Sequence, residues 1–129
     1  MVQIKVGANF KTTQTVTTNK LASFIGSGTA EVFATPMMLA LMENAAFNCL
    51  NEFLDESETS VGTAISSSHI SATPVGLEVY AVAEITAADG RKIDFKIEAF
   101  DSCGKIGEGT HSRFVVDKLK FMQKVNSKK

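Results

Sequence analysis

"FATPMMLALMENAAFNCL", residues 33–50, has the composition of one long, mostly buried helix that holds a single acid, Glu43. Thr35 suits the N-cap, because its hydroxyl can accept a hydrogen bond from a free N–H of the first turn, and Pro36 has the φ angle of a helix start. Neither Gly nor Pro recurs before Phe53, so about 18 helical residues are expected. The polar stripe is narrow and consists of Asn44, Asn48, Asn51 and Glu52. A helix this apolar should be surrounded by protein on most sides.

Four segments after the helix are predicted to be strands, because they are rich in β-branched and aromatic residues and are separated by Pro or Gly turns. They are residues 60–71, 76–87, 91–101 and 105–117, and a shorter strand is expected near "QIKV", residues 3–6. Apolar side chains alternate along the second and third segments, which places them on one face of a sheet. These side chains are Leu77, Val79, Ala81, Ala83 and Ile85, then Ile93, Phe95, Ile97 and Ala99.

The turn between these two strands follows from their shared odd numbering. A three-residue loop of Ala88, Asp89 and Gly90 would pair Ile85 with Ile93 and keep both apolar sets on one face. We therefore predict a bulged hairpin turn with Gly90 at positive φ. Gly104 in "SCGK" is expected to act in the same way at the next turn.

One apolar helix followed by four long antiparallel strands predicts an α+β domain in which a curved sheet wraps around the helix, the hotdog fold. One such domain should span residues 1–129, with a frayed tail at about 122–129. A sheet of this kind has an exposed edge, which a second copy can cover. The expected assembly is a homodimer, or a tetramer built from it.

Composition and charge exclude several classes of protein. The formal net charge of -1 gives no basic field that would attract nucleic acid. No apolar run approaches the length of a membrane span, and the first residues lack the apolar core of a secretion signal, so a cytoplasmic protein is expected. Cys49 and Cys103 have no metal-binding spacing, which predicts reduced thiols and no metal.

Several short motifs together resemble the fluoroacetyl-CoA thioesterase family of hotdog thioesterases. The resemblance covers residues 32–117 and rests on the order and spacing of the motifs. They are A-T-P at 34–36, the acid eight residues after the Thr, V-G-T at 61–63, H-x-x-A-T-P-x-G at 69–76 and G-x-G-T-H-x-R at 107–113. The resemblance implies catalytic roles for Thr35, Glu43 and His69, and an oxyanion-binding backbone N–H at Gly62.

The chemistry of these residue types suits the cleavage of a thioester. The carbonyl is electrophilic and the thiolate leaves readily, so the protein must deliver a nucleophile and stabilise an oxyanion. Glu43 can act as general base on water or as nucleophile, and the sequence leaves both roles open. His69 can orient the carboxylate or protonate the leaving thiolate, while the helix start favours negative charge. No cofactor is expected, since coenzyme A is part of the substrate.

Helix geometry separates two of these residues. Thr35 and Glu43 should lie about 12 Å apart along the helix axis, so their side chains should not touch. Substrate, a water molecule, or His69 from the sheet or from the partner subunit would have to bridge them.

The residues expected to bind substrate are Phe33, Met38 and Arg113. The resembled enzyme covers its fluoroacetyl group with phenylalanines just before the helix, whereas this chain has a Gly-Ser-Gly sequence at 26–28. A matching lid and fluoroacetyl specificity are therefore not expected. The expected substrate is a short-chain or aryl acyl-CoA. Arg113 is a candidate for a coenzyme A phosphate, because Arg binds phosphate well. The same role is open to Lys105, Lys118 and Lys120.

Each candidate also has a structural interpretation. Thr35 can be only a helix cap, Glu43 one half of an ion pair across the dimer, and His69 a core histidine with its hydrogen bonds satisfied. His111 and Arg113 fit an edge pair with Glu98 or Glu108 better than a catalytic role. The methionines Met37, Met38 and Met42 fit the core and the lining of an acyl pocket.

Two other functions remain possible on the sequence alone. The first is a non-catalytic hotdog module that binds an acyl-CoA or a related small acid. The second is a hydratase, which ranks below the others because an Asp and His pair five residues apart is not present. Release of free thiol from acyl-CoA separates a thioesterase from a binding module.

Overall fold

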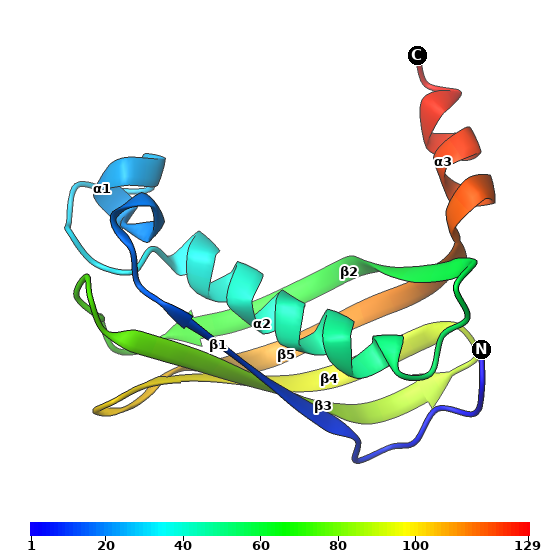
Figure 1. Cartoon of the computed structure of the whole chain (residues 1–129), viewed down its shortest axis with the longest axis horizontal. Helices are drawn as coiled ribbons and strands as arrows, with labels where there is room; N and C mark the ends of the chain where they lie inside the picture. The colour runs from blue at the N-terminus through cyan, green and yellow to red at the C-terminus, as the bar shows by residue number, and fades with distance from the viewer.

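A five-stranded antiparallel sheet, in the order β1-β3-β4-β5-β2, carries one long helix across a face in the computed structural model, which describes residues 1–129 (Figure 1). The elements are β1 (Asn9–Thr15), the 3-10 turn η1 (Thr18–Lys20), α1 (Ala22–Ile25), α2 (Thr35–Asn51), β2 (Glu58–His69), β3 (Glu78–Asp89), β4 (Lys92–Asp101), β5 (Gly104–Asp117) and α3 (Lys118–Asn126). This is the predicted α+β arrangement, with the sheet curved around α2.

The core lies between α2 and the face of β3 and β4 that turns toward it. The sheet contributes Val79, Ala81, Ala83, Ile85, Ile93, Phe95, Ile97 and Ala99, none more than 1% exposed. The helix contributes Met38, Leu41, Met42, Ala45, Ala46, Cys49 and Leu50. The predicted alternation is thus confirmed. Burial of each larger side chain contributes about 1.5–3 kcal/mol, which makes this layer the main source of stability.

The β3–β4 hairpin keeps the predicted parity but not the predicted register. Asp89 pairs with Lys92 across a two-residue turn, and Gly90 has φ +61°, as expected. A bulge between Ile85 and Ala87 then restores the alignment, so that Ile85 faces Phe95 rather than Ile93. The extra residue that parity requires therefore lies inside β3 and not in the loop. Gly104 has φ +140° at the β4–β5 turn, in agreement with the prediction.

The first strand lies later in the chain than predicted. Residues 3–6 form no strand, and β1 instead pairs with β3 through Asn9–Thr15. Its sequence, NFKTTQT, alternates between half-buried and exposed side chains. The half-buried side includes threonine and glutamine, so apolar periodicity does not reveal it, although β-branched threonine favours a strand.

The C-terminal segment is helical where fraying was expected. Asp117 caps α3, since its carboxylate accepts a hydrogen bond from the Lys120 backbone N–H at 3.0 Å. The helix continues to Asn126 and projects away from the sheet (Figure 1). Cys49 is buried, Cys103 is exposed, and neither forms a disulfide. None of the helices is long and apolar enough to cross a membrane.

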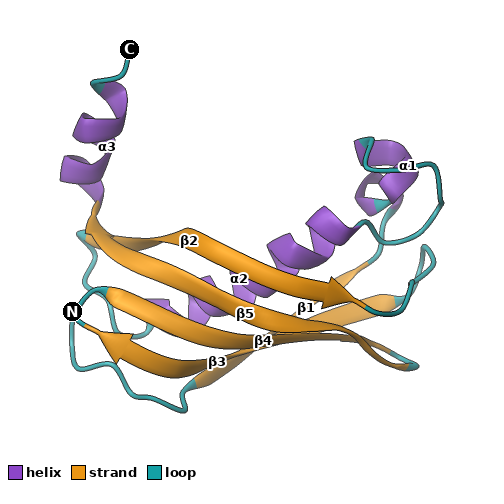
Figure 2. Ribbon diagram, turned by 180° about the vertical axis from the view of Figure 1, so that it is seen from behind, coloured by secondary structure: helices purple, strands orange, loops and turns teal.

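Strand β2 forms the outer edge of the sheet beside β5 (Figure 2). Several of its residues are exposed, including Gly62, Thr63 and Ala64. Helix α2 packs on one face of the sheet, and it carries Thr35 and Glu43. The candidate residues of the sequence analysis therefore gather along the open side of the molecule.

Candidate active site

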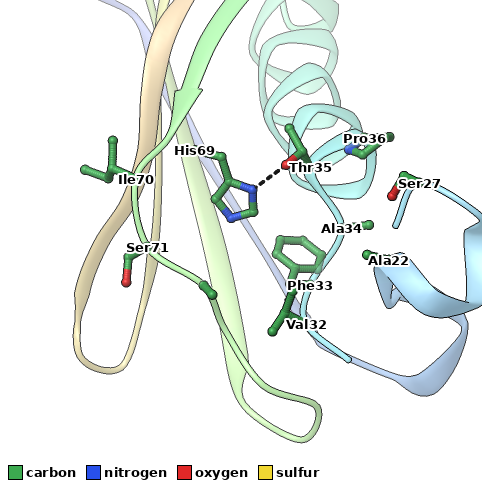
Figure 3. Close-up of a pocket in the computed structure, with 11 residues that line it drawn as sticks. Ala22, Ser27, Val32, Phe33, Ala34, Thr35, Pro36, His69, Ile70 and Ser71 are labelled. Carbon is green, nitrogen blue, oxygen red and sulfur yellow. Dashed lines mark hydrogen bonds between the residues drawn. The ribbon is translucent and has the colours of Figure 1, made fainter. Parts of the chain in front are cut away.

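Thr35 begins helix α2 but does not cap it. The N-cap is Ala34, which has no side chain that could cap, and Thr35 is the first helical residue. The Thr35 hydroxyl oxygen instead lies 2.7 Å from Nδ1 of His69 (Figure 3). The prediction of a Thr35 cap is therefore wrong, because the hydroxyl is turned toward the sheet and pairs with the imidazole.

His69 ends β2 and faces the start of α2. Its Nε2 atom is buried and has no hydrogen-bond partner in the chain. Burial lowers the pKa of His69 below its usual 6.5, so the ring is neutral at pH 7. Either neutral tautomer of the ring can make the contact with Thr35: Nδ1–H donates to the hydroxyl oxygen, or Nδ1 accepts from the hydroxyl hydrogen.

A pocket of about 300 Å3 opens beside this pair. It lies between the start of α2, the segment before that helix and the β2–β3 connection, and its wall includes Phe33, Thr35 and His69 (Figure 3). Phe33 is fully buried as part of the core. Phe33 thus supports the pocket wall from within the core, and its contact with substrate stays a prediction.

Glu43 belongs to a second polar group, farther along α2. Its side chain is 42% exposed, and Oε2 lies 3.8 Å from Nη1 of Arg113. A Cβ atom at Gly62 would stand 3.0 Å from the same carboxylate oxygen, so glycine leaves the space that Glu43 occupies. The expectation of an acid enclosed by apolar neighbours is therefore wrong for the single chain. Glu43 lies at the β2 edge, beside a cation and within reach of water.

Arg113 is a buried and firmly held cation. Its Nε donates to Ser60 Oγ at 2.8 Å, and its Nη2 donates to the Ser60 carbonyl at 2.9 Å. Nη1 lies 3.2 Å from Nε2 of His111, whose Nδ1 is 2.7 Å from the carbonyl oxygen of Ala64. Since a carbonyl only accepts, Nδ1 of His111 carries the proton and Nε2 accepts from Arg113. Burial lowers the pKa of His111, which keeps this ring neutral at pH 7.

These contacts replace the edge pair expected for His111 and Arg113. Glu98 and Glu108 pair with Lys105 instead, at 2.7 and 2.8 Å. The guanidinium of Arg113 is buried and contacts Ser60, His111 and Glu43, and its contact with a coenzyme A phosphate stays a prediction. His111 was not predicted as a site residue. The sequence did carry a signal for it. His111, Arg113 and Val115 are two residues apart, so they share one strand face, and the polar pair on a core-facing face stands out.

Met38 does not border the pocket. It is fully buried, and a Cβ atom at Gly107 would stand 2.6 Å from its sulfur, so the methionine fills space left by that glycine. Its predicted contact with the acyl group therefore has no support in the geometry. No cluster of three or more His, Cys, Asp or Glu side chains that could hold a metal ion is present.

The predicted residues thus form two groups in one chain. Thr35 and His69 make the first, and Glu43 and Gly62 make the second with Arg113. Eight helical residues, or about 12 Å of axis, separate Thr35 from Glu43, and no hydrogen bond joins them. Each group joins α2 to β2, and the second also includes Arg113 of β5.

Comparisons with known proteins agree on one family. The family model of the fluoroacetyl-CoA-specific thioesterase FlK matches residues 16–119. The fluoroacetyl-CoA thioesterase of Streptantibioticus cattleyicolor is 43% identical over 98 residues, which are 76% of this chain and 70% of that protein.

Solved structures extend the similarity to the whole fold. A mutant of FlK superposes with a TM-score of 0.93 at 35% identity and covers 100% of both chains. A mutant of FlK in complex with fluoroacetate and CoA gives 0.86 at 35% identity, over 92% of this chain and 99% of that one. A thioesterase superfamily member from Thermus thermophilus gives 0.91 at 26% identity, over 98% and 94%.

Proposed function

The chain belongs to the fluoroacetyl-CoA-specific thioesterase family, and we infer from this that it is a thioester hydrolase acting on a small acyl-CoA. The observation that carries the proposal for its site is the 2.7 Å contact of Thr35 with His69, at a helix start and on the wall of a pocket. With the His69 proton on Nδ1, the hydroxyl hydrogen of Thr35 is free and can donate to a developing oxyanion. The positive end of the α2 dipole favours the same charge.

We propose that Glu43 acts as general base on the attacking water. The carboxylate is 42% exposed, so water can reach it, and Arg113 at 3.8 Å stabilises its negative charge. Water attacks the thioester carbon as Glu43 takes its proton, and the tetrahedral oxyanion accepts hydrogen bonds from Thr35 and from the backbone N–H of Gly62. Collapse of the oxyanion breaks the C–S bond, and the thiolate leaves and is protonated. These steps need no cofactor beyond the coenzyme A of the substrate.

The separation of the two groups supports a site shared between two copies. Thr63 is the extra residue of the bulge in β2, so Gly62 and His69 each lie three pairing steps from Ser66 along the unpaired edge of the strand. Antiparallel pairing of two such edges about a twofold axis at Ser66 would set Gly62 opposite His69 of a second copy. Glu43 would then approach Thr35 of that copy across the interface. We propose this homodimer as the active form, since it also covers the exposed strand edge.

Thiol release from a panel of acyl-CoA substrates tests the assignment of Glu43. Glu43→Gln keeps the shape of the side chain but removes the base, so kcat/KM should fall at least about 100-fold. Glu84→Gln, at an exposed acid on β3, is the matched control and should leave the rate unchanged. Equal turnover in Glu43→Gln would give Glu43 a structural role only. No thiol release, together with a raised melting temperature on adding acyl-CoA, would instead identify a binding module.

Mixed dimers test the shared site. Thr35→Ala and Glu43→Gln chains, each nearly inactive alone, should regain activity after co-expression. In a mixed dimer one site collects both changes and the other has none. Absence of any recovery, with mixed dimers demonstrated by native mass spectrometry, would place each site within one chain.

The two cysteines support a place in the cytoplasm. Neither Cys49 nor Cys103 is paired in the structure. Free thiols persist in reducing compartments, where disulfides are rare. Cytoplasmic localisation is therefore part of the proposal.

A further inference from the structure

The pocket beside Thr35 and His69 is larger than a two-carbon acyl group requires. Its volume is about 300 Å3, whereas a water molecule takes up about 30 Å3 of the liquid. The methyl group of an acetyl thioester would therefore fill only a small part of it. A larger apolar acyl group would bury more of the apolar wall, so a small acyl group gains less from this pocket.

The chemistry of the wall selects uncharged groups. Small or apolar side chains form most of the surface, among them Ala22, Val32, Phe33 and Ala72. No Lys, Arg, Asp or Glu lines the pocket. An acyl group that ends in a carboxylate would lose its hydration there without gaining a counter-charge.

Part of the segment before α2, residues 26–30, carries no large side chain beside the pocket. Residues 26–30 are Gly-Ser-Gly-Thr-Ala, and Ser27 borders the pocket. A Cβ atom at Gly28 would lie 3.8 Å from Cβ of Ala22, which is ordinary contact distance with a residue of the pocket wall. Position 28 therefore has room for a Cβ atom beside Ala22, a residue of the pocket wall.

We propose that this pocket receives the acyl group and that the preferred substrates are CoA thioesters of uncharged acyl groups about the size of benzoyl. The proposal rests on the thioesterase function inferred above and specifies its substrate class. Val32 and Ala72 contact the ring, and the carbonyl carbon lies at the mouth beside Thr35. Ala22 and Gly28 determine the size of the group that fits.

Rates with three substrates test the proposal on the purified full chain. Benzoyl-CoA should give a kcat/KM at least about tenfold above acetyl-CoA, because extra apolar groups in a fitting pocket are worth about 10–200-fold. Succinyl-CoA should be the poorest of the three. The proposal would be overturned if acetyl-CoA or succinyl-CoA were the best substrate of the three.

Two variants locate the preference. Ala22→Leu and Gly28→Leu should each lower kcat/KM for benzoyl-CoA at least about tenfold and leave acetyl-CoA within about twofold. Ser102→Leu, at an exposed residue of the β4–β5 turn, adds the same side chain elsewhere and should change neither rate. An equal loss on both substrates in Ala22→Leu and Gly28→Leu would contradict the assignment.

A binding measurement keeps the two levels of the proposal apart. Benzoate should raise the melting temperature of the parent chain more than acetate does, and Ala22→Leu should abolish that difference. If no acyl-CoA is hydrolysed but benzoate shows this pattern, the proposed function fails and the pocket assignment stands. If thiol is released but benzoate binds no better than acetate, the pocket assignment fails alone.

Discussion

The two halves of the sheet face under α2 have opposite character. On β3 and β4 this face is wholly apolar and dry, as at Ile97, which is 0% exposed. On β5 and β2 the same face presents His111, Arg113 and Gly62 toward Glu43. One helix therefore packs on an apolar surface along one side and meets a charged group along the other.

This difference separates stability from chemistry. Apolar burial between α2 and β3–β4 needs no directional contacts and contributes most of the folding free energy. A buried guanidinium loses hydration that its partners only partly restore, so it is weak evidence for stability. Arg113 nevertheless has four hydrogen-bonding or ionic contacts, with Ser60, His111 and Glu43. We attribute this arrangement to the reaction, because the fold gains little from it.

Ile97→Ala should produce the largest effect of the comparison, on stability alone. Removal of a fully buried isoleucine leaves a cavity and should lower the free energy of unfolding by about 2–5 kcal/mol. Urea denaturation measures the loss, and the rate per folded molecule should not change. Lys96→Ala, at the exposed neighbouring residue, should cost less than about 0.5 kcal/mol. A large fall in the rate of folded Ile97→Ala would show that the two halves are coupled.

Gly62→Ala should produce the opposite pattern in the polar half. The new methyl group would stand 3.0 Å from Oε2 of Glu43 and 3.2 Å from Cε1 of His111, so both side chains must move by a few tenths of an ångström. Catalysis is sensitive to such displacements, and kcat/KM should fall about tenfold. The melting temperature should fall less than in Ile97→Ala, because the Glu43 side chain is 42% exposed and no cavity forms. Ser66→Ala on the same strand serves as control, and a rate loss there equal to that of Gly62→Ala would point to the strand edge instead of the carboxylate.

Acidification should have the smallest effect, and it should act through the two histidines. Burial lowers the pKa of both His69 and His111 below the ordinary 6.5. The unfolded chain therefore binds more protons than the folded chain as the pH falls through about 6.5, and stability decreases in that direction. Melting temperatures between pH 7.5 and 5 measure the slope. His69→Gln should reduce it, and an unchanged slope in that variant would assign the effect to other groups.

Local sequence patterns predicted most of the fold. The apolar run with Pro36 defined α2, and the odd-numbered alternation defined the core face of β3 and β4. The same parity demanded one extra residue in the hairpin, but it could not place that residue, which lies as a bulge inside β3. β1 was misplaced because its inner face is not consistently apolar.

The candidate site followed from the family resemblance, and its arrangement from the structure. The resemblance named Thr35, Glu43, Gly62 and His69, and the structure places each of them on α2 or β2. His69 was one of the bridges considered between Thr35 and Glu43, and it contacts Thr35, whereas the support of Glu43 by Arg113 was not predicted. The inward turn of His111 and Arg113 was likewise missed, although both share the strand face of Val115.

The sequence by itself determined the elements, their apolar faces and the residue types available for chemistry, because helical and strand periodicity are properties of neighbouring residues. Only the tertiary structure decided which polar side chains meet. Thr35 and His69 are 34 residues apart in the chain, and Glu43 and Arg113 are 70 apart. Their contact depends on how β2 and β5 are aligned beneath α2, and that alignment is fixed by packing of the whole sheet on the helix.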